Sequence, residues 1–262
     1  MSDLLMDQFN RTYPYSPSSA WQKECRDLHK GWLRDLDSNP ELVDELESIY
    51  ETMLPLGKQF EQFVLFWFRH SPHIHLIAHG VQLEGESSTA VEIDFLIKDW
   101  NGDILLIETA LKYFMVTGER KAENCIGPNA KDTLIGKLEK VATKQLNLEF
   151  PPLKSYLSAN SLKSAKPFLI MKGELFYTNT EKHRFGDSTF FNRAFFSGKR
   201  WIFPSKTDWM GPYQKEIGSI PVYESEGAFT RLNEILVETK RSTFLAEVDL
   251  SNNKIIELIP KK

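Results

Sequence analysis

The sequence predicts an α/β or α+β fold, in which a central sheet is flanked by helices. Three observations lead to this prediction. Apolar residues recur at helical spacing early in the chain, two adjacent central segments alternate between apolar and polar residues, and short strand-like segments follow residue 166. We expect residues 1–18 to form a flexible N-terminal arm and residues 19–262 a single domain, with a core over about 40–178 and a β-rich extension over about 179–262.

The first helices are expected from apolar spacing and from signals at their ends. Apolar residues recur every three or four positions from Trp21 to Trp32, which predicts a first helix. Asn39 and Pro40 are typical of an N-cap followed by the first helical residue, so a second helix should run to about Met53. A third helix, over residues 57–70 and ended by Pro72, is apolar almost all round and should therefore be buried.

Two segments, residues 91–100 and 103–114, have the alternation of a strand hairpin. After them we expect a helix with an N-cap at Asn129 and an apolar stripe that extends to Leu148. The remaining elements are expected to be strands at 166–177, 199–204 and 220–224, a helix at 229–240 and a final hairpin at 246–258.

The composition excludes several classes of protein. A net charge of −4 excludes a uniformly basic nucleic-acid binder, and an aromatic content of 12% excludes disorder of the whole chain. Cys25 and Cys125 are too few for a disulfide framework and fit a reducing cytoplasm. The longest strongly apolar run, residues 63–68, is far shorter than the roughly 20 residues of a membrane-spanning helix. We expect a cytoplasmic protein with no membrane partner, and the oligomeric state stays open.

Charge is distributed unevenly along the chain. Residues 31–62 contain two basic and eight acidic residues, whereas residues 111–145 contain seven basic and four acidic ones. Residues 182–206 contain six basic residues and one acidic residue. Aromatic residues interleave there with Arg193 and Arg200, so this segment could stack on bases and contact phosphates, or its aromatic residues could form a β-rich core.

The turn between the two central strands decides which side chains face each other. A two-residue turn at Asn101-Gly102 would place Asp94 opposite Thr109, whereas a three-residue turn ending at Gly102 places Asp94 opposite Glu108. The second register keeps the apolar residues of both strands on one face, so we favour it. Carboxylates whose Cβ atoms lie about 5 Å apart repel each other, and a divalent cation would stabilise them. The alternative is that both point into solvent at the end of the sheet.

Further polar residues are expected near this pair. Lys112 lies on the same face of its strand as Glu108. Glu61 interrupts the buried helix and needs a cation or a hydrogen-bond donor, unless it is exposed in the first helical turn. Gln145 interrupts an apolar stripe, so it either has polar partners or reaches the rim of the core. A basic ridge beside it, which could contact phosphates or form a solvated helix face, consists of Lys137, Lys140 and Lys144.

Five of these residues together resemble the site of the PD-(D/E)XK nuclease superfamily, whose core is a mixed sheet flanked by helices. They are Glu61, Asp94, Glu108, Lys112 and Gln145. More closely, the chain resembles a bacterial family, the domain of unknown function numbered eighteen fifty-three. The matching segments span roughly residues 20–215 and are GKQFEQ, EIDFL, ETALKYF, GPNAKDTLIGKL, KQLNL and KGELFY.

The resemblance implies a restriction-endonuclease-like core with a β-rich C-terminal elaboration, and it assigns roles to single residues. Asp94, Glu108 and Glu61 would be ligands of Mg²⁺ or Mn²⁺. Lys112 would orient or deprotonate the attacking water, and Gln145 would correspond to a polar helix residue of several nuclease branches.

The lysine of the motif is displaced in this sequence. The usual motif places lysine two residues after the acid, but Ala110 holds that position and Lys112 lies four residues after Glu108. The two Cα atoms are then about 13 Å apart rather than about 7 Å.

Three functions follow as hypotheses. The first is a metal-dependent nuclease acting on DNA or RNA, whose phosphate contacts would be Lys137, Lys140, Lys144, Arg193 and Arg200. The displaced lysine motivates the second, a degenerate nuclease fold that binds nucleic acid without cleaving it. The third is a structural or protein-interaction module that uses the acidic residues 31–62 and the aromatic C-terminal half as partner surfaces.

Overall fold

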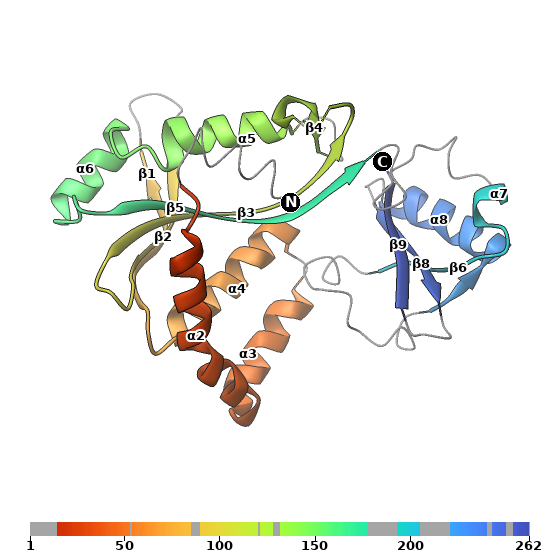
Figure 1. The fold of residues 1–262 in the computed structure, drawn as a ribbon, viewed down its shortest axis with the longest axis horizontal. Helices are drawn as coiled ribbons and strands as arrows, with labels where there is room; N and C mark the ends of the chain where they lie inside the picture. Colours follow the sequence, from red (N-terminus) through yellow and green to blue (C-terminus); the bar gives the residue numbers. More distant parts are fainter. Residues whose placement is uncertain are drawn as a thin grey trace. The chain divides into compact units, whose positions relative to one another are not determined.

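The computed structural model of the chain contains two compact units (Figure 1). The structure describes residues 15–52, 54–84, 90–119, 121–127, 132–177, 193–204, 221–239, 243–249 and 254–261. Among these, the N-terminal unit takes the residues within Met6–Leu111 and Lys137–Lys172, and the C-terminal unit takes those within Lys112–Gly136 and Gly173–Lys262. No helix in the described ranges is long and apolar enough to cross a membrane. Most of the expected N-terminal arm, up to residue 14, lies outside these ranges.

Two of the helices that open the N-terminal unit begin with a side-chain cap, and the cap at Asn39 was predicted. The Ser18 side chain accepts a hydrogen bond from the Trp21 backbone N–H, and Asn39 does the same for Leu42. The predicted first three helices are therefore confirmed. Their bounds are α2 Ser19–Asp35, α3 Pro40–Glu51 and α4 Leu56–His70, with a short 3₁₀ turn at Leu36–Ser38 between the first two.

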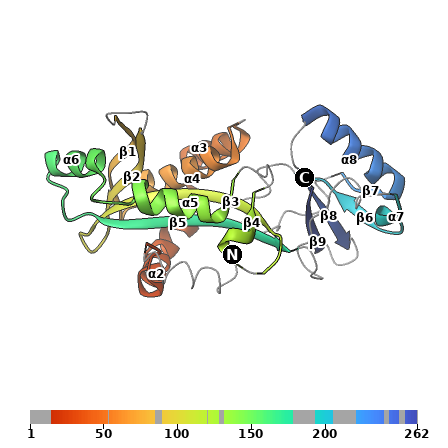
Figure 2. The same ribbon diagram turned by 90° about the horizontal axis from the view of Figure 1, so that it is seen from above.

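A five-stranded sheet follows the helices. The strand order is β1-β2-β3-β4, with β5 paired to β3 (Figure 2), and the pairs along that path are antiparallel. The sequence did not predict β1, whose partly buried residues show no clean alternation and whose pairing with β2 shifts register between Leu76 and Ala78. The strands are β1 His75–Leu83, β2 Val91–Lys98, β3 Ile104–Val116, β4 Cys125–Ile126 and β5 Lys166–Tyr177.

The predicted three-residue turn between β2 and β3 is confirmed. Phe95 pairs with Ile107 and Lys98 with Ile104, and Gly102 has a φ of +82°, the left-handed conformation that this turn requires. One face of the hairpin packs on α4, and the core between them consists of Val64, Leu65, Phe68, Ile74, Phe95, Ile97, Leu105 and Ile107.

The opposite face of the sheet is covered by α5 (Leu134–Lys140), as Figure 1 shows. The helix continues as a π-helical segment over Val141–Gln145 and then ends. The expectation of a regular helix reaching Leu148 is therefore wrong, because the chain turns after Gln145, and the expected N-cap Asn129 lies outside the described residues. A further helix, α6 (Pro151–Ala159), was not predicted, although proline at its first positions is a typical start signal.

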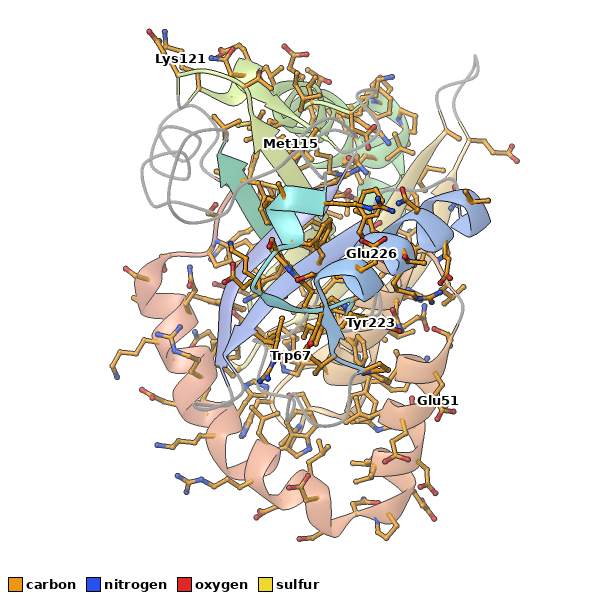
Figure 3. The ribbon with its side chains drawn as sticks, turned by 90° about the vertical axis from the view of Figure 1, so that its right-hand side faces the viewer. Glu51, Trp67, Met115, Lys121, Tyr223 and Glu226 are labelled. Atoms are coloured by element: carbon orange, nitrogen blue, oxygen red, sulfur yellow. The ribbon has the colours of Figure 1, made fainter. Side chains whose placement is uncertain are left out.

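The C-terminal unit contains a second antiparallel sheet with strand order β7-β6-β8-β9. Its core includes Phe196, Trp201 and Leu245, and Tyr223 packs against them; Figure 3 shows Tyr223 and the α8 residue Glu226. The predicted strands and helix of this half are confirmed. Their bounds are β6 Arg200–Ile202, β7 Tyr223–Glu224, α8 Ser225–Thr239, β8 Thr243–Asp249 and β9 Lys254–Lys261, and a short helix that was not predicted, α7, spans Arg193–Phe196.

Candidate functional site

Two buried carboxylates lie in the N-terminal unit where the β2–β3 ladder ends. Asp94 is 7% exposed and Glu108 is 4% exposed. The paired register stops at Phe95 and Ile107, one step before these two residues. Asp94 Oδ2 accepts hydrogen bonds from the backbone N–H of Thr109 at 2.8 Å and from its hydroxyl at 2.9 Å. The Asp94 carboxylate thus replaces a backbone acceptor, and this fixes its position at the end of the ladder.

A lysine from the covering helix contacts the second carboxylate. Lys137 Nζ lies 2.7 Å from Glu108 Oε1, and the side chains are only 15% and 5% exposed. The same ammonium donates a hydrogen bond to Gln145 Oε1 at 3.2 Å. Glu108, Lys137 and Gln145 therefore form one connected polar group, with Asp94 beside it.

Burial and like charge perturb both acids. Burial and, to a smaller extent, the negative charge of Asp94 raise the pKa of Glu108 to about 7, although the positive charge of Lys137 opposes this rise. Burial also raises the pKa of Asp94, while its hydrogen bonds from Thr109 lower it. One ammonium therefore does not fully compensate the two carboxylates, and the site favours additional positive charge.

Glu61 lies on α4 and is also buried, at 6% exposure. Lys58 Nζ lies 2.8 Å from its Oε2, and His79 Nε2 lies 3.3 Å from its Oε1. Lys58 also contacts Glu92 at 3.2 Å. Glu61 is therefore not exposed in the first helical turn, and it has two basic partners, as the first of the two alternatives expected. The negative charge of Glu61 also raises the pKa of Asp94.

Lys112 belongs to the C-terminal unit, where its Nζ donates to Asp132 Oδ2 at 3.1 Å. The ammonium that contacts Glu108 is instead that of Lys137, which the sequence had placed on a phosphate-binding ridge. Of that ridge, Lys140 is exposed and Lys144 is half-buried.

The two arginines expected to contact phosphates lie in the C-terminal unit. Arg193 pairs with Glu226 at 2.8 Å and Arg200 with Glu224 at 3.4 Å, all at exposed or half-exposed positions. Much of the surrounding basic segment, including Phe190 and Phe191, lies outside the described residues.

The donor set limits which metal could fit the Asp94–Glu108 pair. In the part of the chain that the structure describes, no group of three or more His, Cys, Asp or Glu side chains converges on one point. Zinc sites need three or four such ligands, whereas Mg²⁺ is commonly held by one or two carboxylates together with water and substrate oxygens. Two adjacent carboxylates with raised pKa values fit the second pattern.

A family model described as domain of unknown function (DUF1853) matches residues 1–257. The chain belongs to this family. Comparisons with curated proteins and with solved structures found no match.

Two contacts of this DUF1853 site were not expected from the sequence. One is the Lys137–Glu108 pair, and the other is the cap that Thr109 provides for Asp94. Lys137 and Gln145 are eight residues apart, which in a regular α-helix turns their side chains by about 80° relative to each other. The π-helical segment before Gln145 advances by a smaller angle per residue and brings the Gln145 side chain to the Lys137 ammonium, a change that apolar spacing does not reveal.

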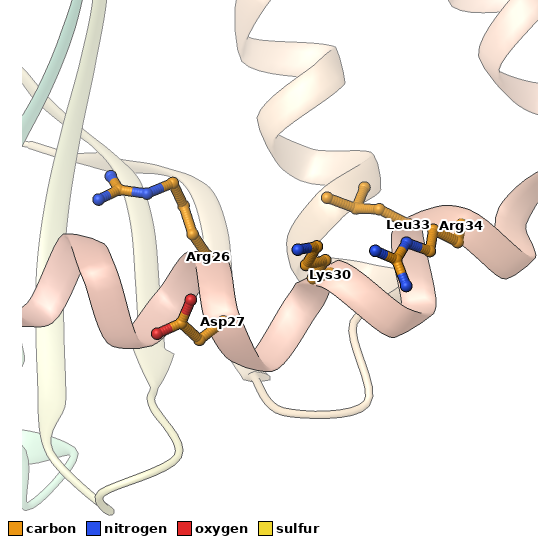
Figure 4. A pocket seen from close by; sticks show the side chains of 5 residues that line it. All are labelled: Arg26, Asp27, Lys30, Leu33 and Arg34. Carbon is orange, nitrogen blue, oxygen red and sulfur yellow. The ribbon is translucent and has the colours of Figure 1, made fainter.

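A second polar surface lies on α2 of the same unit. A shallow hollow there is lined by Arg26, Asp27, Lys30, Leu33 and Arg34 (Figure 4). None of the residues predicted to form the site lines it. The buried group around Asp94 and Glu108 is therefore the candidate site of this DUF1853 protein.

Proposed function

We propose that the protein is a metal-dependent phosphodiesterase that hydrolyses DNA or RNA at a PD-(D/E)XK-like site on a restriction-endonuclease-like core. The observation that carries the proposal is the buried pair of Asp94 and Glu108 with the Lys137 ammonium on Glu108. Burying two acids side by side is unfavourable unless a cation compensates them, so such an arrangement is typical of functional sites.

Asp94 and Glu108 would hold Mg²⁺ or Mn²⁺, and Glu61 would add negative charge from α4. When bound, such an ion polarises a phosphoryl group and lowers the pKa of a coordinated water. Thr109 would keep the Asp94 carboxylate oriented through its two hydrogen bonds.

Lys137 would take the role that the motif gives to Lys112. Its ammonium is at the carboxylate pair, where it can stabilise negative charge that develops on a phosphate, and Gln145 holds it in place. Lys140 and Lys144, on the same helix, would contact neighbouring phosphates of the nucleic acid.

The test is a cleavage assay on single- and double-stranded DNA and on RNA, with Mg²⁺, with Mn²⁺ and with a chelator. We expect the protein to cleave only when Mg²⁺ or Mn²⁺ is present. Cleavage should be lost in Asp94→Asn and Glu108→Gln, and its rate should fall by about 100-fold or more in Lys137→Met. The Lys112→Met variant tests whether Lys112 or Lys137 acts as the lysine of the motif. Lys154→Met is the matched control, because Lys154 pairs with Glu149 at 2.6 Å at the surface of the same unit. Intact substrates under all conditions would refute the proposal.

A second candidate function is binding of nucleic acid without cleavage. The Lys137–Glu108 ion pair favours it, since an internal ammonium already compensates Glu108 in part. This function predicts salt-dependent binding without turnover that Asp94→Asn leaves unchanged.

A further inference from the structure

We propose that Lys137 is a built-in counter-ion of the metal site: it occupies Glu108 in the metal-free protein, and a divalent cation must displace it onto Gln145. This inference deepens the proposed function and rests on it, because it concerns how the same site takes up its metal.

The contact distances support the first half of the inference. Lys137 Nζ is 2.7 Å from Glu108 Oε1, in a pair whose side chains are 15% and 5% exposed. A divalent cation on a carboxylate oxygen lies about 2.1 Å from it. The ion and the ammonium would then be like charges only a few ångströms apart with little water between them, so both cannot stay on this oxygen at low cost.

Gln145 supports the second half. Its Oε1 already accepts a hydrogen bond from Lys137 Nζ at 3.2 Å. When Lys137 leaves Glu108, its ammonium therefore keeps an acceptor and does not become a buried group without a partner. The π-helical segment Val141–Gln145 is the local feature that brings this acceptor to the site.

Lys137 would therefore weaken the binding of the metal but increase the rate of the reaction. It lowers the affinity of the resting protein for the ion, and once displaced it stays within reach of a phosphate at the same site. Removing the lysine should separate these two effects.

The experiment is a calorimetric titration of the full chain with Mn²⁺ at pH 8.5, after chelator treatment. We expect Lys137→Met to bind Mn²⁺ at least 10-fold more tightly than the wild type, although its cleavage is slower. Lys154→Met, the surface lysine control, should bind Mn²⁺ with wild-type affinity. Equal or weaker binding by a folded Lys137→Met protein would overturn the inference.

A second variant keeps the test independent of whether Lys137→Met folds. Gln145→Leu removes the alternative acceptor, so displacement of the lysine becomes costlier, and Mn²⁺ should bind several-fold more weakly than to the wild type. Unchanged affinity in Gln145→Leu would also overturn the inference. If the affinities follow the expected order and no nucleic acid is cleaved, the proposed function fails and the counter-ion role stands.

Discussion

The raised pKa of Glu108 predicts how the stability of the metal-free protein depends on pH. The perturbation is a rise in pH from 4.5 to 8 in the presence of a chelator. The folded protein holds the Glu108 proton up to about pH 7, whereas a glutamate in the unfolded chain releases it near 4.5. The unfolded state therefore binds fewer protons in this interval, and the free energy of unfolding must fall as the pH rises through it.

The magnitude follows from the difference between the two pKa values. The two pKa values differ by about 2.5, which corresponds to about 3 kcal/mol in the free energy of unfolding. This stability is lost between pH 4.5 and 7, and no more of it is lost at higher pH. This loss is a large part of the stability of an ordinary domain.

Urea unfolding at pH 5, 6, 7 and 8 measures the effect, with Glu108→Gln as the reference. Glutamine keeps the shape of the side chain and does not titrate, so the wild type should lose about 3 kcal/mol relative to this variant as the pH rises. Parallel stability curves for the two proteins across this range would refute the reasoning.

Three further predictions concern other single polar residues. Lys137→Met leaves the Glu108 carboxylate without its ammonium, so it should lower the free energy of unfolding by about 3–5 kcal/mol at pH 8. The loss should be much smaller at pH 5, because Glu108 is protonated there. Urea unfolding at both pH values measures the difference. Thr109→Val removes the hydroxyl that donates to Asp94 Oδ2 and should cost about 1–3 kcal/mol, whereas Thr109→Ser should retain most of the stability in the same assay. His29 is buried between Cys25 O and Ser71 Oγ, and burial lowers its pKa, so its contribution should be complete above pH 6.5 and be lost as the pH falls below it. Urea unfolding of the wild type and of His29→Gln at pH 7 and pH 5 measures that loss, and an equal response of the two proteins would contradict it.

The hairpin and the start of the second helix were predicted because local residues determine them. Gly102 selects the three-residue turn, and alternation then places the apolar side chains on the face that packs on α4. Ser18 and Asn39 fix the starts of two helices through hydrogen bonds to residues three positions away.

The polar contacts of the site depend on interactions that are distant in sequence. Lys137 reaches Glu108 because α5 packs across the sheet, and the π-helical segment after α5 brings Gln145 to the same ammonium; neither feature has a periodic signal. Lys112 lies on the same strand as Glu108, four residues further along, yet its ion-pair partner is Asp132. The strand β1 was missed because most of its residues are partly buried on both faces and show no alternation.

A crystal of the protein soaked in Mn²⁺ tests the central claim most directly, through the anomalous difference map. We predict a peak within coordination distance of both Asp94 and Glu108, with the Lys137 ammonium moved from Glu108 towards Gln145. A map without a peak at these two carboxylates, with Lys137 still bound to Glu108, would contradict the account of this site.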